Sequence, residues 1–255
     1  MLKIQTFGNK THITDLLIVH GLFGSGRNWR AIARNISSDR RVHVVDMRNH
    51  GESFWDTDNS YESMAEDLKK IITSLENPVD VLGHSMGGKA SMILAINNPD
   101  LVNRLLIVDI APTKYQHDQS INISIMKNLP IDDLTRRSDA DLILKKTLPD
   151  DALRAFFLQS LIISPNGNSW QLNLDALDKN MDKIIGFPDV SGQFNGMTFF
   201  LKGELSNYIS DKDLPNINLL FPKNKIITIK NAGHWVHAEA TRDFLISVKE
   251  YLSGS

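Results

Sequence analysis

The stretch Val79–Leu94, with the sequence VDVLGHSMGGKASMIL, decides the fold of this chain. Its first residues form a short, mostly apolar run typical of a buried strand, and Ala90, Ile93 and Leu94 have the spacing of a helix. Between the two lies the pattern G-x-S-x-G, centred on Ser85. The bare pattern also occurs in ordinary turns. In a strand–turn–helix context, however, it holds the serine on a sharp, strained turn with its hydroxyl exposed. Ser85 is therefore predicted to be a nucleophile.

Strands and helices alternate on both sides of this motif. Short apolar runs rich in β-branched residues are typical of strands that are buried on both faces. Such runs are Leu16–His20, Val42–Asp46, Val79–Gly83, Leu105–Asp109, Met197–Lys202 and Ile226–Ile229. Helical patterns lie between several of them, and the clearest begins after Ser60, a residue typical of a helix N-cap. The alternation predicts a mostly parallel sheet with helices on both faces.

The alternation stops after Ala111 and resumes near Met197. The segment between them carries helical apolar patterns without a convincing strand. Prolines at positions 130, 149, 165 and 188 predict boundaries of several short helices. We therefore predict a core of residues 1–112 and 196–255, with a helical cap of residues 113–195 inserted into it.

Composition excludes several classes of protein. The chain has 255 residues and a formal net charge of −2, so it lacks the excess charge that favours nucleic acids or anionic lipids. No apolar run approaches the roughly 18 residues of a membrane span, and the N-terminus lacks the pattern of a signal peptide. The absence of cysteine excludes disulfides and thiolate catalysis. We expect a cytoplasmic protein that is a monomer or a small homo-oligomer, with no nucleic acid partner.

A nucleophilic serine needs a general base, and His234 is the predicted one. It lies in the sequence NAGHW, directly after the last predicted strand and before a helical pattern, in the chain order expected for this motif. His237 is expected to be a structural or rim residue, because no nearby acidic motif completes a zinc site with the pair. Neither a metal nor a cofactor is expected. The histidines at positions 12, 43 and 117 are expected at the surface.

The loop after the first predicted strand reads HGLFG, from His20 to Gly24, and its glycines permit a close approach of the backbone to the reacting centre. The N–H groups of Leu22 and Met86 are predicted to form the oxyanion hole. The same loop nearly matches the phosphate-binding pattern G-x-x-x-x-G-K-[ST]. Arg27 and Asn28 replace its lysine and hydroxyl, which disfavours a nucleotide hydrolase.

A carboxylate must orient the histidine, and two positions compete for this role. Asp109 ends a predicted strand at the catalytic edge of the sheet. Glu204, with Asp211 and Asp213 beyond it, follows the strand after the insertion. We favour Asp109, although an aspartate there could instead cap the turn into Ala111–Pro112. The loop of residues 46–53, DMRNHGES, is expected to be structural, with Asp46 and Arg48 holding the loops around the site.

Five blocks of the sequence closely resemble the YbfF-type acyl esterases, a bacterial branch of the α/β hydrolases. These blocks are HGLFGSGRNW, VVDMRNHGES, LGHSMGGKA, VDIAPTKY and AGHWVHAE, and the resemblance is weaker through the insertion. It implies an α/β-hydrolase fold in which a small helical cap over the pocket follows the sixth strand. Because the family's acid also follows that strand, it implies a triad of Ser85, His234 and Asp109.

The predicted function is hydrolysis of carboxylic esters with short to medium acyl chains through an acyl-enzyme, and some members of the family also act on thioesters. The residues predicted to contact substrate are Phe23, His84, Phe156, Phe157, Trp170 and Trp235, although aromatic residues at helical spacing are more often core. Two alternatives are an acyl-CoA thioesterase and a lactonase with the same triad. A third is a binding protein that keeps the fold without turnover.

Overall fold

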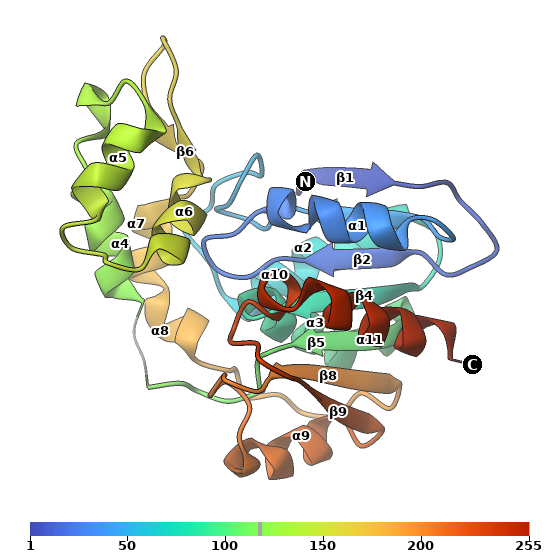
Figure 1. Cartoon of the computed structure of the whole chain (residues 1–255). Helices are drawn as coiled ribbons and strands as arrows, with labels where there is room; N and C mark the ends of the chain where they lie inside the picture. Colours follow the sequence, from blue (N-terminus) through green and yellow to red (C-terminus); the bar gives the residue numbers. More distant parts are fainter. Residues whose placement is uncertain (117–118, 255) are drawn as a thin grey trace.

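The computed structural model describes residues 1–116 and 119–254, so His117 lies outside the described residues. A seven-stranded sheet forms the centre of the molecule (Figure 1). Its strands are β1 (Ile4–Phe7), β2 (Leu16–Val19), β3 (Val42–Val45), β4 (Val79–His84), β5 (Val102–Val108), β8 (Met197–Gly203) and β9 (Asn224–Ile229). The order is β1-β3-β2-β4-β5-β8-β9, and only β1 pairs antiparallel to its neighbour. The predicted, mostly parallel sheet is confirmed.

Strand β1 has no counterpart in the sequence prediction. It is only partly buried, so it lacks the continuous apolar run that identified the other strands. The resemblance implied that the insertion follows a sixth strand, whereas in the described chain it follows β5. The two statements differ only in how the strands are numbered, because a single strand, β1, precedes β2 here. The insertion still begins after the strand that leads into Asp109.

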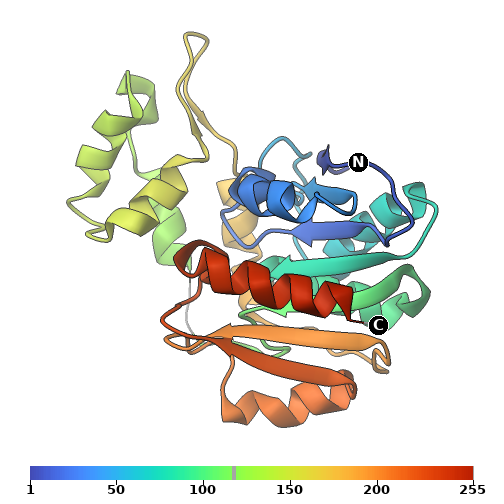
Figure 2. The ribbon, with the colours of Figure 1, turned by 45° about the vertical axis from the view of Figure 1, so that its right-hand side comes forward.

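Helices cover both faces of the sheet, as predicted (Figures 1 and 2). One face packs against α1 (Arg30–Ile36) and α11 (Thr241–Ser253), and the other against α2 (Tyr61–Ser74), α3 (Met86–Asn97) and α9 (Leu214–Leu220). Side chains of the strands alternate between the two cores: Leu16 and Ile18 lie on the side of α1, Leu17 and Val19 on the side of α2. Short elements complete the core: η1 (Gly26–Trp29), η2 (Pro99–Leu101), η4 (Asp211–Asp213) and α10 (Val236–Glu239).

The segment between β5 and β8 forms several short helices beside the carboxyl ends of the strands (Figure 1). They are α4 (Ser120–Lys127), η3 (Ile131–Asp133), α5 (Arg137–Leu144), α6 (Asp151–Leu158), α7 (Leu174–Lys179) and α8 (Met181–Ile185). The sequence predicted no strand here, yet β6 (Leu161–Ile162) and β7 (Ser169–Trp170) form a hairpin. Two residues are too few to show alternation. Pro165 lies in the loop of this hairpin rather than at a helix end.

The end of α8 is tied to the core by two buried side chains. The hydroxyl of Tyr61 donates to the carbonyl of Ile184 at 2.6 Å, and Lys89 Nζ donates to the carbonyls of Ile185 at 3.0 Å and Gly186 at 2.5 Å. The Lys89 ammonium also lies 4.6 Å from the centre of the Tyr115 ring. Burial lowers the pKa of Lys89 to about 7. The helix that begins after Ser85 therefore also anchors the inserted segment.

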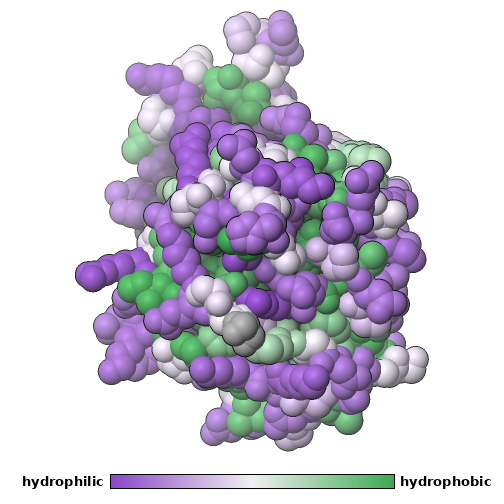
Figure 3. All heavy atoms as spheres, turned by 90° about the vertical axis from the view of Figure 1, so that its right-hand side faces the viewer, coloured by the Kyte–Doolittle hydropathy of each residue, from purple (hydrophilic) through white to green (hydrophobic). Residues whose placement is uncertain are grey.

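On the face shown in Figure 3, hydrophilic side chains predominate and hydrophobic ones form only small groups. Within residues 1–116 and 119–254, no helix is both long and apolar enough to cross a membrane.

Candidate active site

Ser85 occupies the sharp turn between β4 and α3 that its motif predicts. Its φ of 52° and ψ of −121° are strained for a residue other than glycine. The glycines beside it allow this turn to pack closely on β2. A Cβ atom at Gly87 would overlap the main-chain carbonyls of Val19 and His20. The turn exposes the serine hydroxyl at the carboxyl edge of the sheet.

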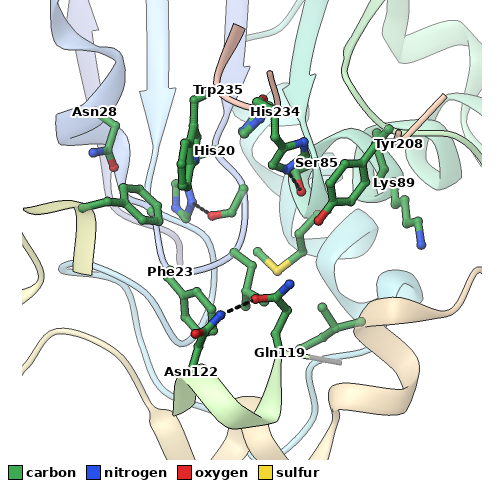
Figure 4. A pocket seen from close by; sticks show the side chains of 18 of the residues that line it. His20, Phe23, Asn28, Ser85, Lys89, Gln119, Asn122, Tyr208, His234 and Trp235 are labelled. Atoms are coloured by element: carbon green, nitrogen blue, oxygen red, sulfur yellow. Dashed lines mark hydrogen bonds between the residues drawn. The ribbon is translucent and has the colours of Figure 1, made fainter. Parts of the chain in front are cut away.

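The three side chains predicted to be catalytic form a hydrogen-bonded line, and Figure 4 shows two of them, Ser85 and His234. Ser85 Oγ lies 3.0 Å from His234 Nε2, and His234 Nδ1 lies 2.8 Å from Asp109 Oδ2. Because Nδ1 faces a carboxylate, it carries the proton, which leaves Nε2 free to accept the serine proton. The three residues follow β4, β5 and β9, strands whose carboxyl ends share one edge of the sheet.

Asp109 is fully buried, whereas the competing carboxylates hold loops elsewhere. Glu204 is exposed and accepts the N–H of Asn231 at 3.0 Å. Asp213 accepts the N–H of Ser210 at 2.8 Å, at the start of η4. The structure thus brings Asp109, and not Glu204, to the imidazole of His234.

The two N–H groups predicted to form the oxyanion hole lie at the turn that carries Ser85. Met86 is the first residue of α3, so the helix offers its N–H no acceptor. In residues 1–116 and 119–254, the N–H of Leu22 has no hydrogen-bond partner. Gly21 lies so close that a Cβ there would be 3.0 Å from the Cβ of Ser85. Both amides are therefore available to an oxyanion.

Two buried histidines that the sequence analysis did not single out hold this loop in place. His20 donates from Nδ1 to the carbonyl of Gly21 at 2.8 Å and accepts the N–H of Met47 at Nε2, at 2.9 Å. His50 donates from Nδ1 to the carbonyl of Arg48 at 2.8 Å and accepts the N–H of Phe23 at 3.2 Å. Each ring must be neutral to accept a hydrogen bond at Nε2 while it donates from Nδ1. Burial favours this neutral form, because it lowers the pKa of His20 to about 4 and that of His50 to about 3.

The loop of residues 46–53 has the structural role that was predicted. Asp46 Oδ1 accepts the N–H of Gly26 at 2.6 Å, and its Oδ2 accepts the N–H of Glu52 at 2.8 Å. Arg48 pairs with the buried carboxylate of Asp67, at 2.6 Å from Nε to Oδ2. These contacts fix the loops that surround the turn between β4 and α3.

Behind His234 lies a layer of aromatic rings. His84 Nε2 donates to the carbonyl of His234 at 2.9 Å, and burial holds the pKa of His84 well below its usual range. His84 was predicted to contact substrate, and although it lines the cavity, its polar contact supports the backbone of His234. His237 stacks on Trp29 at 4.1 Å between ring centres, in the structural role that was predicted for it.

The other histidine expectations differ in outcome. His12 is exposed, as predicted. His43, which was predicted at the surface, is buried in β3 and contacts Asp15 and Thr6. The strand needed all four of its residues in the interior, and these two polar partners allow a histidine there.

The buried histidines predict a loss of stability in acid. Burial lowers the pKa of His237 to about 3, and those of His20 and His50 similarly, against an ordinary value of 6.5. Below pH 6.5 the unfolded chain binds these protons first, so the stabilisation is complete above that pH and is lost as the pH falls toward the folded-state pKa. As the pH falls from 6.5 to 5, the contribution of each of these histidines should lower the free energy of unfolding by about 1 to 2 kcal/mol.

Urea denaturation at a series of pH values measures this effect. The variant His237→Phe keeps a ring against Trp29 and should remove the part of the pH dependence of the unfolding free energy that comes from His237. The control His12→Ala, at an exposed site, should leave that pH dependence unchanged. An unaltered pH dependence in His237→Phe would contradict the assignment.

A cavity of about 290 Å³ opens at Ser85. Of the residues predicted to contact substrate, five line it: Phe23, His84, Phe156, Phe157 and Trp235. Rings of the insertion meet rings of the core around it, with Phe157 edge-on to Phe23 at 5.3 Å and Phe156 at 5.6 Å from Trp235.

Trp170, the sixth residue predicted to contact substrate, is not among the residues that line this cavity. It lies in β7, paired with Leu161 in the hairpin, and only 9 % of it is exposed. The hairpin directs its ring into the packed interior.

The cavity is also lined by polar side chains that no sequence motif had indicated. Asn122 Nδ2 donates to Gln119 Oε1 at 2.7 Å at the start of α4, and Figure 4 shows this pair facing the core residues. Asn28 Nδ2 donates to Gln159 Oε1 at 2.7 Å, joining the core to the insertion. The described residues contain no cluster of three or more histidines and carboxylates suited to hold a metal.

Comparisons with known proteins agree with this geometry. The family model described as alpha/beta hydrolase fold matches residues 15–241. The chain is 38% identical to the mouse (Mus musculus) protein named sn-1-specific diacylglycerol lipase ABHD11, over 93% of this chain and 80% of the relative. It is 31% identical to esterase YbfF of Escherichia coli K12, over 99% and 98% of the two chains. The latter confirms the resemblance drawn from the sequence motifs.

A solved structure titled marine microorganism esterase superposes with a TM-score of 0.93 at 37% identity, covering 98% of both chains. With a family model that spans most of its length and relatives of this similarity, the chain belongs to the α/β-hydrolase fold family.

Proposed function

We propose that the protein hydrolyses carboxylic esters with short to medium acyl chains through a covalent acyl-enzyme. The observation that carries this proposal is the hydrogen-bonded line from Ser85 through His234 to the buried Asp109, which opens into a mostly apolar cavity. Similarity to proteins named esterase and lipase supports the same reaction class.

In the proposed mechanism, Ser85 Oγ attacks the ester carbonyl while His234 Nε2 takes its proton. The N–H groups of Leu22 and Met86 stabilise the negative oxygen of the tetrahedral intermediate. Asp109 stabilises the imidazolium, which then protonates the departing alcohol as the C–O bond breaks. A water molecule then attacks the acyl-enzyme while His234 Nε2 takes its proton. The imidazolium returns that proton to Ser85 Oγ as the bond between Oγ and the acyl carbon breaks, which releases the acid.

The acyl and alcohol groups are proposed to contact Phe23, Phe156, Phe157 and Trp235, with His84 behind the catalytic histidine. Residues 113–195 are proposed to act as a cap domain on the core of residues 1–112 and 196–255, because α6 supplies two of these rings. A thioester would fit the same chemistry, since it presents the same carbonyl to Ser85. Cytoplasmic location and a monomeric or small homo-oligomeric state stay predictions.

A series of p-nitrophenyl esters from acetate to palmitate tests the proposal. We expect turnover at neutral pH, with the highest kcat/KM among short to medium chains, because the cavity of about 290 Å³ is small for a ligand pocket. A diacylglycerol assay addresses the substrate named for the mouse relative. Hydrolysis of acyl thioesters without any hydrolysis of oxygen esters would favour a thioesterase instead. Absence of turnover on all of them would favour a binding protein.

A further inference from the structure

The cavity wall that the insertion forms carries a pair of amide side chains. Gln119 and Asn122 both line the cavity, and each is half-buried. Asn122 Nδ2 donates to Gln119 Oε1 at 2.7 Å. We term these two side chains the amide pair, and Figure 4 shows them facing the core side of the cavity. Because each amide holds the other, both are oriented before a substrate binds.

The amide pair does not cap the helix that carries it. Gln119 occupies the N-cap position of α4, where a side-chain oxygen commonly accepts a main-chain N–H of the first turn. The side chain of Gln119 makes no such bond. Residues three apart lie on the same side of a helix, so Gln119 can bond with Asn122 at the cavity wall instead.

The bond within the amide pair leaves one donor group and one acceptor group unused. Among residues 1–116 and 119–254, Gln119 Nε2 and Asn122 Oδ1 have no hydrogen-bond partner. If both amides were rotated by half a turn, the bond between them would again leave an NH₂ group and a carbonyl oxygen. The amide pair is therefore complementary to a group that both accepts and donates a hydrogen bond.

Other polar side chains of the cavity wall have partners inside the protein. The hydroxyl of Tyr61 and the ammonium of Lys89 donate to main-chain carbonyls at the end of α8. Asn28 uses both ends of its amide, since Oδ1 accepts the N–H of Ser25 at 2.8 Å and Nδ2 donates to Gln159. Apart from the histidines, Lys89 is the one charged side chain among the described residues that line the cavity. An ionised substituent would thus find no free counter-charge, whereas an uncharged polar group could bind the amide pair.

The position of the amide pair indicates which part of the substrate reaches it. In Figure 4 the amide pair and His234 lie on opposite sides of Ser85. In the proposed mechanism His234 protonates the departing alcohol, so the alcohol must lie on the side of His234. The acyl chain then extends from the carbonyl toward α4.

We propose that Gln119 and Asn122 determine substrate specificity: they bind an uncharged hydrogen-bonding group, such as a carboxamide or a hydroxyl, on the acyl chain of the ester. This inference rests on the proposed function and names a substrate class for it. A purely hydrocarbon chain would cover the amide pair without replacing its hydrogen bonds to water. Because a buried polar group without a partner is costly, such a chain should be disfavoured.

The test uses p-nitrophenyl esters whose acyl chains end in a carboxamide, a methyl ketone or an isopropyl group, after methylene spacers of several lengths. These ends are similar in size, but the carboxamide accepts and donates, the ketone only accepts, and the isopropyl group does neither. At the best spacer, kcat/KM of the wild type should be about 10-fold higher for the carboxamide than for the isopropyl ester, with the ketone between them. In the double variant Gln119→Leu/Asn122→Leu, this ratio should fall to about 1 or below.

Asn128→Leu is the matched control. Asn128 follows the same helix, is exposed, bonds to Ser124 and is not among the residues that line the cavity. This variant should keep the wild-type ratio. Equal kcat/KM for the carboxamide and isopropyl esters in the wild type, or an unchanged ratio in the double variant, would overturn the proposal. A preference for the carboxamide only when it is placed on the alcohol of acetate esters would overturn it as well.

Binding without turnover separates this inference from the proposed function. Calorimetric titration of Ser85→Ala with the same esters should give a Kd about 10-fold lower for the carboxamide than for the isopropyl ester. Adding the two leucine substitutions to Ser85→Ala should remove this difference. Both results are expected even if the wild type hydrolyses no ester. Equal Kd values in Ser85→Ala would count against the amide pair even if the wild type hydrolyses every ester.

Discussion

Ser85→Ala is expected to lower kcat/KM for p-nitrophenyl esters by about 10⁵-fold or more, a loss typical of removing the nucleophile from a serine hydrolase. Without Oγ no acyl-enzyme can form, and His234 Nε2 loses the hydroxyl that lies 3.0 Å from it. The remaining oxyanion donors and cavity cannot replace a covalent step. Initial rates with matched protein concentrations measure the loss.

Covalent labelling provides the second half of this test. A fluorophosphonate should label the wild type at Ser85, and Ser85→Ala should not react. Ser74→Ala is the control, because Ser74 lies at the far end of α2 and its hydroxyl caps that helix at the carbonyl of Ile71. It should keep full labelling and turnover. Hydrolysis that survives in Ser85→Ala would mean that another residue is the nucleophile.

Asp109→Asn should lower kcat by about 10⁴-fold, the effect known for the same change in a serine protease triad. The reason lies in the three donors that surround the carboxylate, from Gly203, Ser206 and His234. An amide offers only one oxygen, so its NH₂ group must face a donor, and it carries no charge to stabilise an imidazolium. Circular dichroism and thermal unfolding establish that the variant is folded.

Glu204→Gln is the matched comparison for this prediction, because Glu204 is the rival carboxylate suggested by the sequence. Its contact is with the N–H of Asn231, at 3.0 Å, and an amide oxygen can accept the same bond. Activity should stay within a few-fold of the wild type. Near-normal turnover in Asp109→Asn, together with a dead Glu204→Gln, would reverse the assignment of the acid.

The positions of Ser85, Asp109 and His234 could be predicted because each follows directly from the backbone plan of the fold. A glycine-flanked serine must lie where a strand turns into a helix. An aspartate or histidine placed just after a parallel strand must lie at the same carboxyl edge. The spacing along the chain was enough to place all three at that edge, and the structure adds the distances between them.

The supporting residues could not be predicted, because their roles depend on side-chain contacts between distant segments. His20 and His50 belong to the quoted blocks, yet nothing in the sequence says that their rings accept backbone N–H groups from other loops. Ser206 lies in a loop without a recognisable motif, and its hydroxyl reaches Asp109 only because β8 lies beside β5. The presence of His20 and His50 next to glycine-containing loops is the one signal that could have drawn attention to them.

The insertion was predicted least well, and the reasons are local. The strands β6 and β7 are two residues each, so no alternation could reveal them. Trp170 looked like a pocket residue by composition alone, and the hairpin buries it elsewhere. The elements of the insertion are too short for their apolar spacing to show which face is buried. Which side chains face the cavity therefore depends on the turns between these elements.

The place of the insertion, between neighbouring strands β5 and β8, has a consequence for how the enzyme can change over evolutionary time. The entropy of closing a chain segment rises only with the logarithm of its length, so lengthening or shortening this segment costs the sheet little stability. Its rings nevertheless supply part of the cavity wall. Insertions, deletions or recombination in this segment can therefore change substrate preference. The residues that cleave the bond, at the carboxyl edge of the sheet, need not change.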